Sequence, residues 1–253
     1  IIEVERIACF AQHFFKREDL FLLGVRGTLL NSLLFALCPV PVLNCLILCN
    51  LFAIRQKNLK RFLAFSSISQ AGYLMLGVYT GSAHGMATMV FYLFIYMFTN
   101  LSAFGIVGII ENKTGKLNVE DYNGLYETNP KLAVGMMLAM FSLGGIPVFA
   151  GFFSKFFIFV GACRTGNVAV YVLVLIALIN TIISLYYYLL VVKAMFIRQD
   201  ECVIPRLKSA LSERLGMILC VLGIIFIGLV SCIYTGLYNI SLSTGMELFQ
   251  FVR

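Results

Sequence analysis

Residues 144–157 of this chain read GGIPVFAGFFSKFF, and they lie in a stretch, residues 132–160, that has no ionisable side chain other than Lys155. A lysine near the centre of a bilayer costs about 2.5–3.5 kcal/mol on insertion scales. Glycine and proline in the same stretch disfavour a continuous helix. Such a costly combination predicts a functional element, a broken helix that carries a buried amine.

The position of the break follows from helix geometry. A single helix over residues 132–161 would be about 45 Å long, well beyond a hydrocarbon layer of about 30 Å. Pro147 has no amide proton to donate to the carbonyl of Leu143, and Gly144 and Gly145 let the backbone unwind. We therefore expect a discontinuous helix whose break lies near Gly144, Gly145 and Pro147 and lines a cavity.

Composition places the rest of the chain in a membrane. Of 253 residues, 60% are hydrophobic and 12% are charged, with a mean hydropathy of +0.93, which leaves too little polar surface for a soluble globule. Six apolar stretches are about long enough to cross a bilayer, namely 28–54, 62–80, 85–110, 132–161, 168–197 and 215–240. The fold class predicted is an all-α integral membrane protein with about six transmembrane helices, one of them discontinuous.

Three segments divide the chain in this prediction. Residues 28–240 form the six-helix membrane domain. Residues 1–27 form an amphipathic or interfacial segment, because FFKRED interrupts their apolar run. Residues 241–253 form a carboxyl-terminal tail.

The net charge of +7 is unevenly placed. Basic residues gather in alternate loops, around 55–61, 111–131 and 193–214, while the intervening turns 81–85 and 161–167 are nearly free of them. This alternation follows the positive-inside rule and indicates membrane topology, so we expect no nucleic-acid partner. The loop with Lys57, Lys60 and Arg61 is expected on the matrix or cytoplasmic side.

Lys155 has no carboxylate in the predicted membrane spans of its own chain. Its amine is therefore neutral, hydrated or paired with another subunit. The alternative, a lysine that extends its amine to the interface, requires a long reach from this position. The three tyrosines at 186–188 lie near a basic loop and are interpreted as an interfacial aromatic belt, with a proton relay as the alternative. The cysteines are interpreted as apolar packing residues, and no metal site is expected.

Three stretches resemble a known family: NLFAIRQKNLKRFLAFSSISQAGYLMLG (50–77), FSLGGIPVFAGFFSKFFIF (141–159) and SLYYYLLVVKAMF (184–196). They are similar to the antiporter-like subunits of respiratory complex I, in particular subunit 2 of NADH dehydrogenase. The resemblance implies a fold of inverted five-helix repeats, of which this chain matches the second repeat plus the closing helix. It also implies a split subunit, whose first repeat lies on a separate chain.

The resemblance further implies a proton half-channel centred on Lys155. Gln70 and Thr99 stand where some relatives have histidine, so a water chain is expected in place of a histidine relay. Its expected lining residues are Ser66, Ser69, Gln70 and Thr99, with Ser154 ordering water beside Lys155. No cofactor is expected in this chain; FMN, iron–sulfur clusters and ubiquinone are expected in other subunits of the complex.

The expected assembly is a proton-translocating NADH:ubiquinone reductase, to which this chain contributes no redox site. Its expected partners are other membrane-arm subunits, the first-repeat chain and membrane lipid. The expected location is the mitochondrial inner membrane, with the bacterial plasma membrane as the alternative. Two other functions remain open: a scaffold half-subunit that moves no protons, and an independent cation/proton antiporter.

Overall fold

The computed structural model describes residues 39–79, 83–147, 149–197, 204–207 and 211–229, and these form helices and connections without a strand. The helices are α3 (Pro39–Ile54), α4 (Leu59–Tyr79), α5 (Ala83–Thr114), η2 (Val119–Tyr122), α6 (Leu125–Thr128), α7 (Pro130–Gly144), α8 (Ala150–Cys163), α9 (Val168–Phe196) and α10 (Leu211–Leu229). The predicted all-α class is confirmed for this part of the chain. The segments predicted at 1–27 and 241–253 lie outside the described residues.

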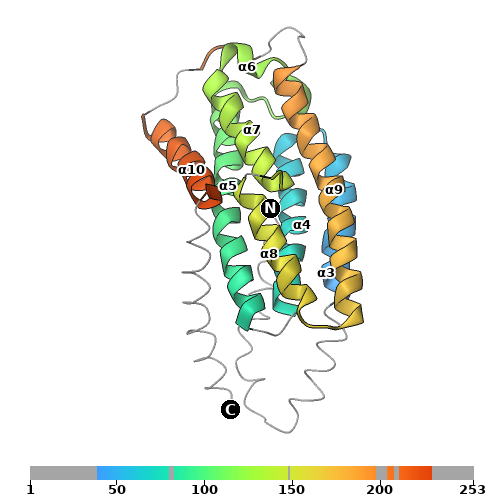
Figure 1. Ribbon diagram of the computed structural model, residues 1–253. Helices are drawn as coiled ribbons and strands as arrows, with labels where there is room; N and C mark the ends of the chain where they lie inside the picture. Colours follow the sequence, from blue (N-terminus) through green and yellow to red (C-terminus); the bar gives the residue numbers. More distant parts are fainter. Residues whose placement is uncertain (1–38, 80–82, 148, 198–203, 208–210, 230–253) are drawn as a thin grey trace, which may run out of the picture.

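The long helices stand side by side as a bundle (Figure 1). Helix α5 contacts α4, α7, α8 and α10, while α9 contacts α3, α7 and α8. Each of the six apolar stretches overlaps at least one described helix, and 132–161 overlaps two, α7 and α8. Within the described residues, two helical segments, Gly85–Thr114 and Val168–Phe196, are long and apolar enough by themselves to span a membrane. The number of crossings stays a prediction.

The bundle surface is rich in exposed apolar side chains, and the interior buries polar groups beside its apolar core. Ile182 on α9 is 70% exposed, and Leu101 on α5 is 57% exposed. By contrast, the interior buries the polar side chains of Asn50, Gln70 and Asn180. Such an arrangement suits a hydrocarbon solvent, because the bilayer solvates the apolar surface while the polar groups pair within the protein.

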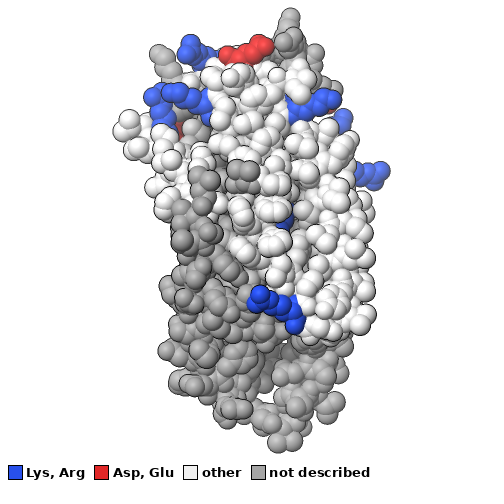
Figure 2. Space-filling model, viewed as in Figure 1, with Lys and Arg blue, Asp and Glu red and all other residues white. Residues whose placement is uncertain are grey.

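The basic loops meet at one end of the bundle. The amide of Leu59 donates to the carbonyl of Leu117 over 2.8 Å, and the side-chain amide of Asn129 donates to the carbonyl of Pro205 over 3.0 Å. Figure 2 shows most of the blue side chains at this end, which also carries α6. The predicted grouping of the three loops is therefore present, while the membrane side that they face is untested.

One detail of the predicted basic loop is wrong. Of Lys57, Lys60 and Arg61, only Lys57 lies in the connection, because Lys60 and Arg61 belong to the first turn of α4. The reason is the side chain of Asn58, whose Oδ1 accepts hydrogen bonds from the amides of Lys60 and Arg61 at 3.0 and 3.1 Å. This geometry caps the helix and starts it earlier than the hydropathy pattern indicated.

A sharp stop separates α7 from α8. Gly145 has φ +77°, and its amide donates to the carbonyl of Ser142 while the amide of Ile146 donates to that of Phe141, each over 3.1 Å. These bonds form a Schellman motif, which requires a residue in the left-handed region and so favours glycine. Helix α8 begins five residues later at Ala150.

Candidate functional site

Lys155 lies on α8 with only 4% of its surface exposed. Its Nζ donates a hydrogen bond of 2.8 Å to the carbonyl oxygen of Leu143, near the end of α7. In an unbroken helix this carbonyl would accept from the amide of residue 147, which is proline and has no amide proton. The lysine therefore supplies the donor that the break removes.

Two further contacts fix the lysine side chain. Its Nζ lies 4.9 Å from the ring centroid of Tyr73 on α4, within range of a cation–π interaction. A Cβ on Gly145 would lie 3.3 Å from its Cδ, so the glycine leaves room for the aliphatic stem. The two ion pairs found in the described part of the chain do not include Lys155.

Gln70 connects this lysine to buried hydroxyl groups. Its Nε2 lies 3.2 Å from the Tyr188 hydroxyl and 3.5 Å from the Leu143 carbonyl oxygen, the second being a weak contact. Its Oε1 accepts from the hydroxyl of Tyr92, and the Tyr188 hydroxyl bonds to that of Ser66. Polar groups thus run from Ser66 through Tyr188 and Gln70 to the carbonyl that Lys155 binds, while the roles of Ser66 and Gln70 in a water path stay predictions.

Thr99 and Ser154 line the same small cavity as Lys155 and Gln70. The Thr99 hydroxyl donates to the carbonyl of Ile95 over 2.8 Å. It also lies 3.2 Å from the side-chain hydroxyl of Ser142. Ser154 donates to the carbonyl of Gly151 over 2.9 Å. Thr99, Ser154 and Lys155 line a cavity of about 10 Å³. This volume is close to the minimum of about 10–15 Å³ that one water needs.

Ser69 belongs to a second polar cluster, centred on Asn50. The Oδ1 of Asn50 accepts from the hydroxyls of Ser69 at 3.0 Å and Tyr187 at 2.6 Å. Its Nδ2 donates to Oδ1 of Asn180 over 3.1 Å. Ser69 therefore pairs directly with Asn50, and its place on a water path that includes Lys155 stays a prediction.

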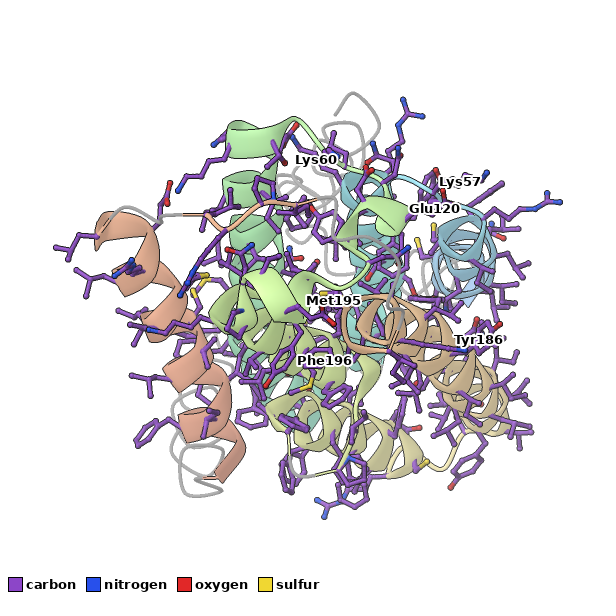
Figure 3. The ribbon with its side chains drawn as sticks, turned by 90° about the horizontal axis from the view of Figure 1, so that it is seen from above. Lys57, Lys60, Glu120, Tyr186, Met195 and Phe196 are labelled. Carbon is purple, nitrogen blue, oxygen red and sulfur yellow. The ribbon has the colours of Figure 1, made fainter. Side chains whose placement is uncertain are left out.

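The interpretation of all three tyrosines at 186–188 as an interfacial belt is wrong. Tyr186 is 59% exposed, and it lies on the outer side of α9 in Figure 3. Tyr187 and Tyr188 are buried and belong to the two polar clusters. Helical spacing could have found them, since Asn180, Ser184 and Tyr187 recur at intervals of four and three residues and so share a face of α9.

A pocket of about 280 Å³ opens at the basic end, and Tyr187 is among its lining residues. Tyr187 and Tyr188 lie against each other, with their ring centroids 4.7 Å apart. Polar side chains thus extend from this pocket through the two tyrosines and Gln70 toward Lys155.

The fold and the site together define a class of protein. It is a helical membrane protein in which the amine of a lysine, placed where a helix is broken, meets a path of buried polar groups. Ion sites in transporters typically have this arrangement.

Comparison with known families identifies the class more closely. Residues 37–184, more than half of the chain, match the family model described as NADH:quinone oxidoreductase/Mrp antiporter, TM. The chain belongs to this family.

Its relatives are subunits of quinone reductases. It is 52% identical over 216 residues to NADH-quinone oxidoreductase subunit N of Phocaeicola vulgatus, a match that covers 85% of this chain and 45% of the relative. It is 44% identical over 156 residues to NAD(P)H-quinone oxidoreductase subunit 2 of a Synechocystis strain, which covers 62% of this chain and 29% of the relative. The chain thus spans less than half the length of these relatives.

Solved structures agree on the fold. A chain of respiratory complex I from Thermus thermophilus with bound Aureothin superposes with a TM-score of 0.64 at 33% identity, covering 79% of this chain and 43% of that one. A chain of an archaeal membrane-bound sulfane sulfur reductase superposes with a TM-score of 0.78 at 24% identity, covering 87% of this chain and 44% of that one. The second likeness shows the fold alone.

Proposed function

We propose that this chain acts as an antiporter-like subunit in the membrane arm of a proton-pumping NADH:quinone oxidoreductase. In this role it contributes a proton half-channel centred on Lys155, with α7 and α8 forming one discontinuous crossing among about six. The names of its relatives support membership of such a complex. Oxidation of NADH and reduction of quinone then belong to other subunits, which hold FMN, iron–sulfur clusters and ubiquinone.

The hydrogen bond from Lys155 to the Leu143 carbonyl carries this proposal. A protonated amine donates to that carbonyl, and a neutral amine still has N–H groups that can do so while its lone pair accepts a proton. Lys155 can therefore change its protonation state without losing its anchor at the break. Tyr73 and the carbonyl also replace part of the hydration that a buried ammonium loses.

A proton route follows from the polar groups. Protons enter at the pocket by Tyr187, pass Tyr188 and reach Lys155 beside Gln70. Because the cavity at Lys155 is about 10 Å³, transfer along this route requires further water to enter when the complex turns over. The path is therefore gated by hydration.

We further propose that the chain works in an energy-transducing membrane beside other membrane-arm subunits and the first antiporter-like repeat. Either a longer form of the polypeptide or a separate chain can supply that repeat. The mitochondrial inner membrane and the bacterial plasma membrane both meet the requirement, and the relative with 52% identity is bacterial.

A scaffold role is the second candidate, and the small cavity at Lys155 favours it. An independent cation/proton antiporter is the third, because the family model that matches this chain also covers Mrp antiporters. Native gels test this third candidate: co-migration of the chain with NADH dehydrogenase activity would exclude an independent antiporter.

Lys155→Met tests the role in proton transfer. It keeps the length of the side chain and removes the titratable amine, so the assembled complex should lose proton pumping or coupled turnover. Lys131→Met changes an exposed lysine at the first turn of α7 and should leave pumping unchanged. If Lys155→Met assembles, oxidises NADH and pumps at the unmodified ratio, the residue is structural and the scaffold role replaces the half-channel.

A further inference from the structure

The pocket of about 280 Å³ at the basic end has a charged rim and a mostly apolar wall. Its lining residues are Ala53, Ile54, Gln56, Lys57, Phe62, Val119, Glu120, Tyr187, Leu190, Val191, Lys193 and Ala194. Lys57 follows the end of α3, and Lys193 lies in the last turn of α9. The rim therefore lies where the apolar helices give way to charged loops, which is the level of lipid head groups.

Backbone hydrogen bonds hold the rim together. The amide of Val119 donates to the carbonyl of Lys57 over 2.9 Å, which ties η2 to the connection after α3. The amide of Gly124 donates to the carbonyl of Ala194 over 3.3 Å, which ties the same connector to the end of α9. The pocket is thus built by three segments fixed to one another.

Two cations and one carboxylate line this rim: Lys57, Lys193 and Glu120. All three side chains are exposed, and the two ion pairs found among the described residues involve none of them. In the view from above, Lys57 and Glu120 lie near each other (Figure 3). A ligand that carries a phosphate and an ammonium group would complement both signs of charge.

We propose that this pocket binds the head group of an aminophospholipid of the phosphatidylethanolamine class. The phosphate binds Lys57 and Lys193, and the primary ammonium donates to the carboxylate of Glu120. Basic pockets at the ends of membrane helices are recognised sites for lipid head groups, and here the carboxylate selects against a purely anionic one. This inference requires only that the chain lies in a bilayer, and it does not depend on proton transfer.

Pocket volume and the adjoining surface fit this ligand. About 280 Å³ lies just below the range of about 300–1,000 Å³ for small-molecule sites, so a head group fits while whole acyl chains do not. Acyl chains would instead lie along the exposed apolar side chains of Leu51 and Ile54 on α3 and of Tyr186 and Leu190 on α9. These residues continue the pocket wall, to which Ile54 and Leu190 themselves belong.

Lipid retention tests the site. The complex that contains this chain is partly delipidated, incorporated into nanodiscs with equal phosphatidylethanolamine, phosphatidylglycerol and phosphatidylcholine, and its retained lipids are measured by native mass spectrometry. Phosphatidylethanolamine should be enriched, because the quaternary ammonium of phosphatidylcholine cannot donate to Glu120. Lys57→Gln and Lys193→Gln should each reduce its retention about tenfold, the effect of one charge-assisted hydrogen bond.

Glu120→Gln is the sharpest variant, because it should reverse the preference toward phosphatidylglycerol while keeping a lipid bound. Lys131→Gln, an exposed lysine outside the pocket lining, is the matched control and should change nothing. A preference for phosphatidylglycerol in the unmodified protein would overturn the proposal. Displacement of lipid by millimolar inorganic phosphate alone would also overturn it, since the site would then be a simple anion site.

Discussion

The contact between the two helices at the break predicts a large effect of Gly151→Ala. A Cβ at this position would overlap the carbonyl oxygen of Ser142 and lie 2.6 Å from its carbonyl carbon, against 3.4–4 Å for an ordinary contact. Both obstructing atoms are backbone atoms, so the methyl group fits only if α7 and α8 move apart. The Gly151 amide, which donates to the Ser142 hydroxyl over 3.2 Å, would move as well.

The magnitude follows from two opposing terms. Overpacking costs about 1–3 kcal/mol, and more where the backbone must shift. Replacing glycine by alanine in a helix recovers up to about 1 kcal/mol. We expect a net loss of about 2 kcal/mol or more in the free energy of unfolding, which lowers the Tm by about 4–8 °C for a chain of this size.

Thermal unfolding of the purified protein in detergent measures this loss. The control is Gly105→Ala on α5, where an added Cβ has no atom within 4 Å and only the gain in helix propensity remains. Gly151→Ala should also reduce proton pumping, because Lys155 lies one turn further along the same face of α8. The reasoning fails if the Gly151 and Gly105 variants unfold at the same temperature.

Two smaller predictions concern polar pairs. Asn50→Leu removes the acceptor for the hydroxyls of Ser69 and Tyr187. The free energy of unfolding should fall by about 1–3 kcal/mol for each buried group left unsatisfied, which thermal unfolding measures. Unchanged stability would show that other partners replace Asn50. Lys60 and Glu111 form an ion pair of 2.9 Å with exposed fractions of 52% and 29%, so a double-mutant cycle should give a coupling below about 1 kcal/mol that falls with salt. A coupling above about 2 kcal/mol would indicate that this pair holds α4 to α5.

Much of the local structure at the break was predictable from the sequence. Pro147 lacks an amide proton and Gly145 tolerates a positive φ. Both properties belong to the residues themselves, so the end of α7 follows from local chemistry. The membrane class was predictable from the sequence as well, since hydropathy depends on composition. So was the grouping of the basic loops, since the alternation of charge depends on the order of residues along the chain.

Only the tertiary structure decided which groups meet Lys155. Nothing local to α8 selects the Leu143 carbonyl, the Tyr73 ring or Gln70 as its neighbours, because these come from α7 and α4 through the packing of the bundle. Packing also assigned Ser69 to Asn50 and placed Tyr187 inside the bundle. Sequence determines which residues can titrate or break a helix, whereas the rotation of each helix against its neighbours determines which of them lie within hydrogen-bonding distance.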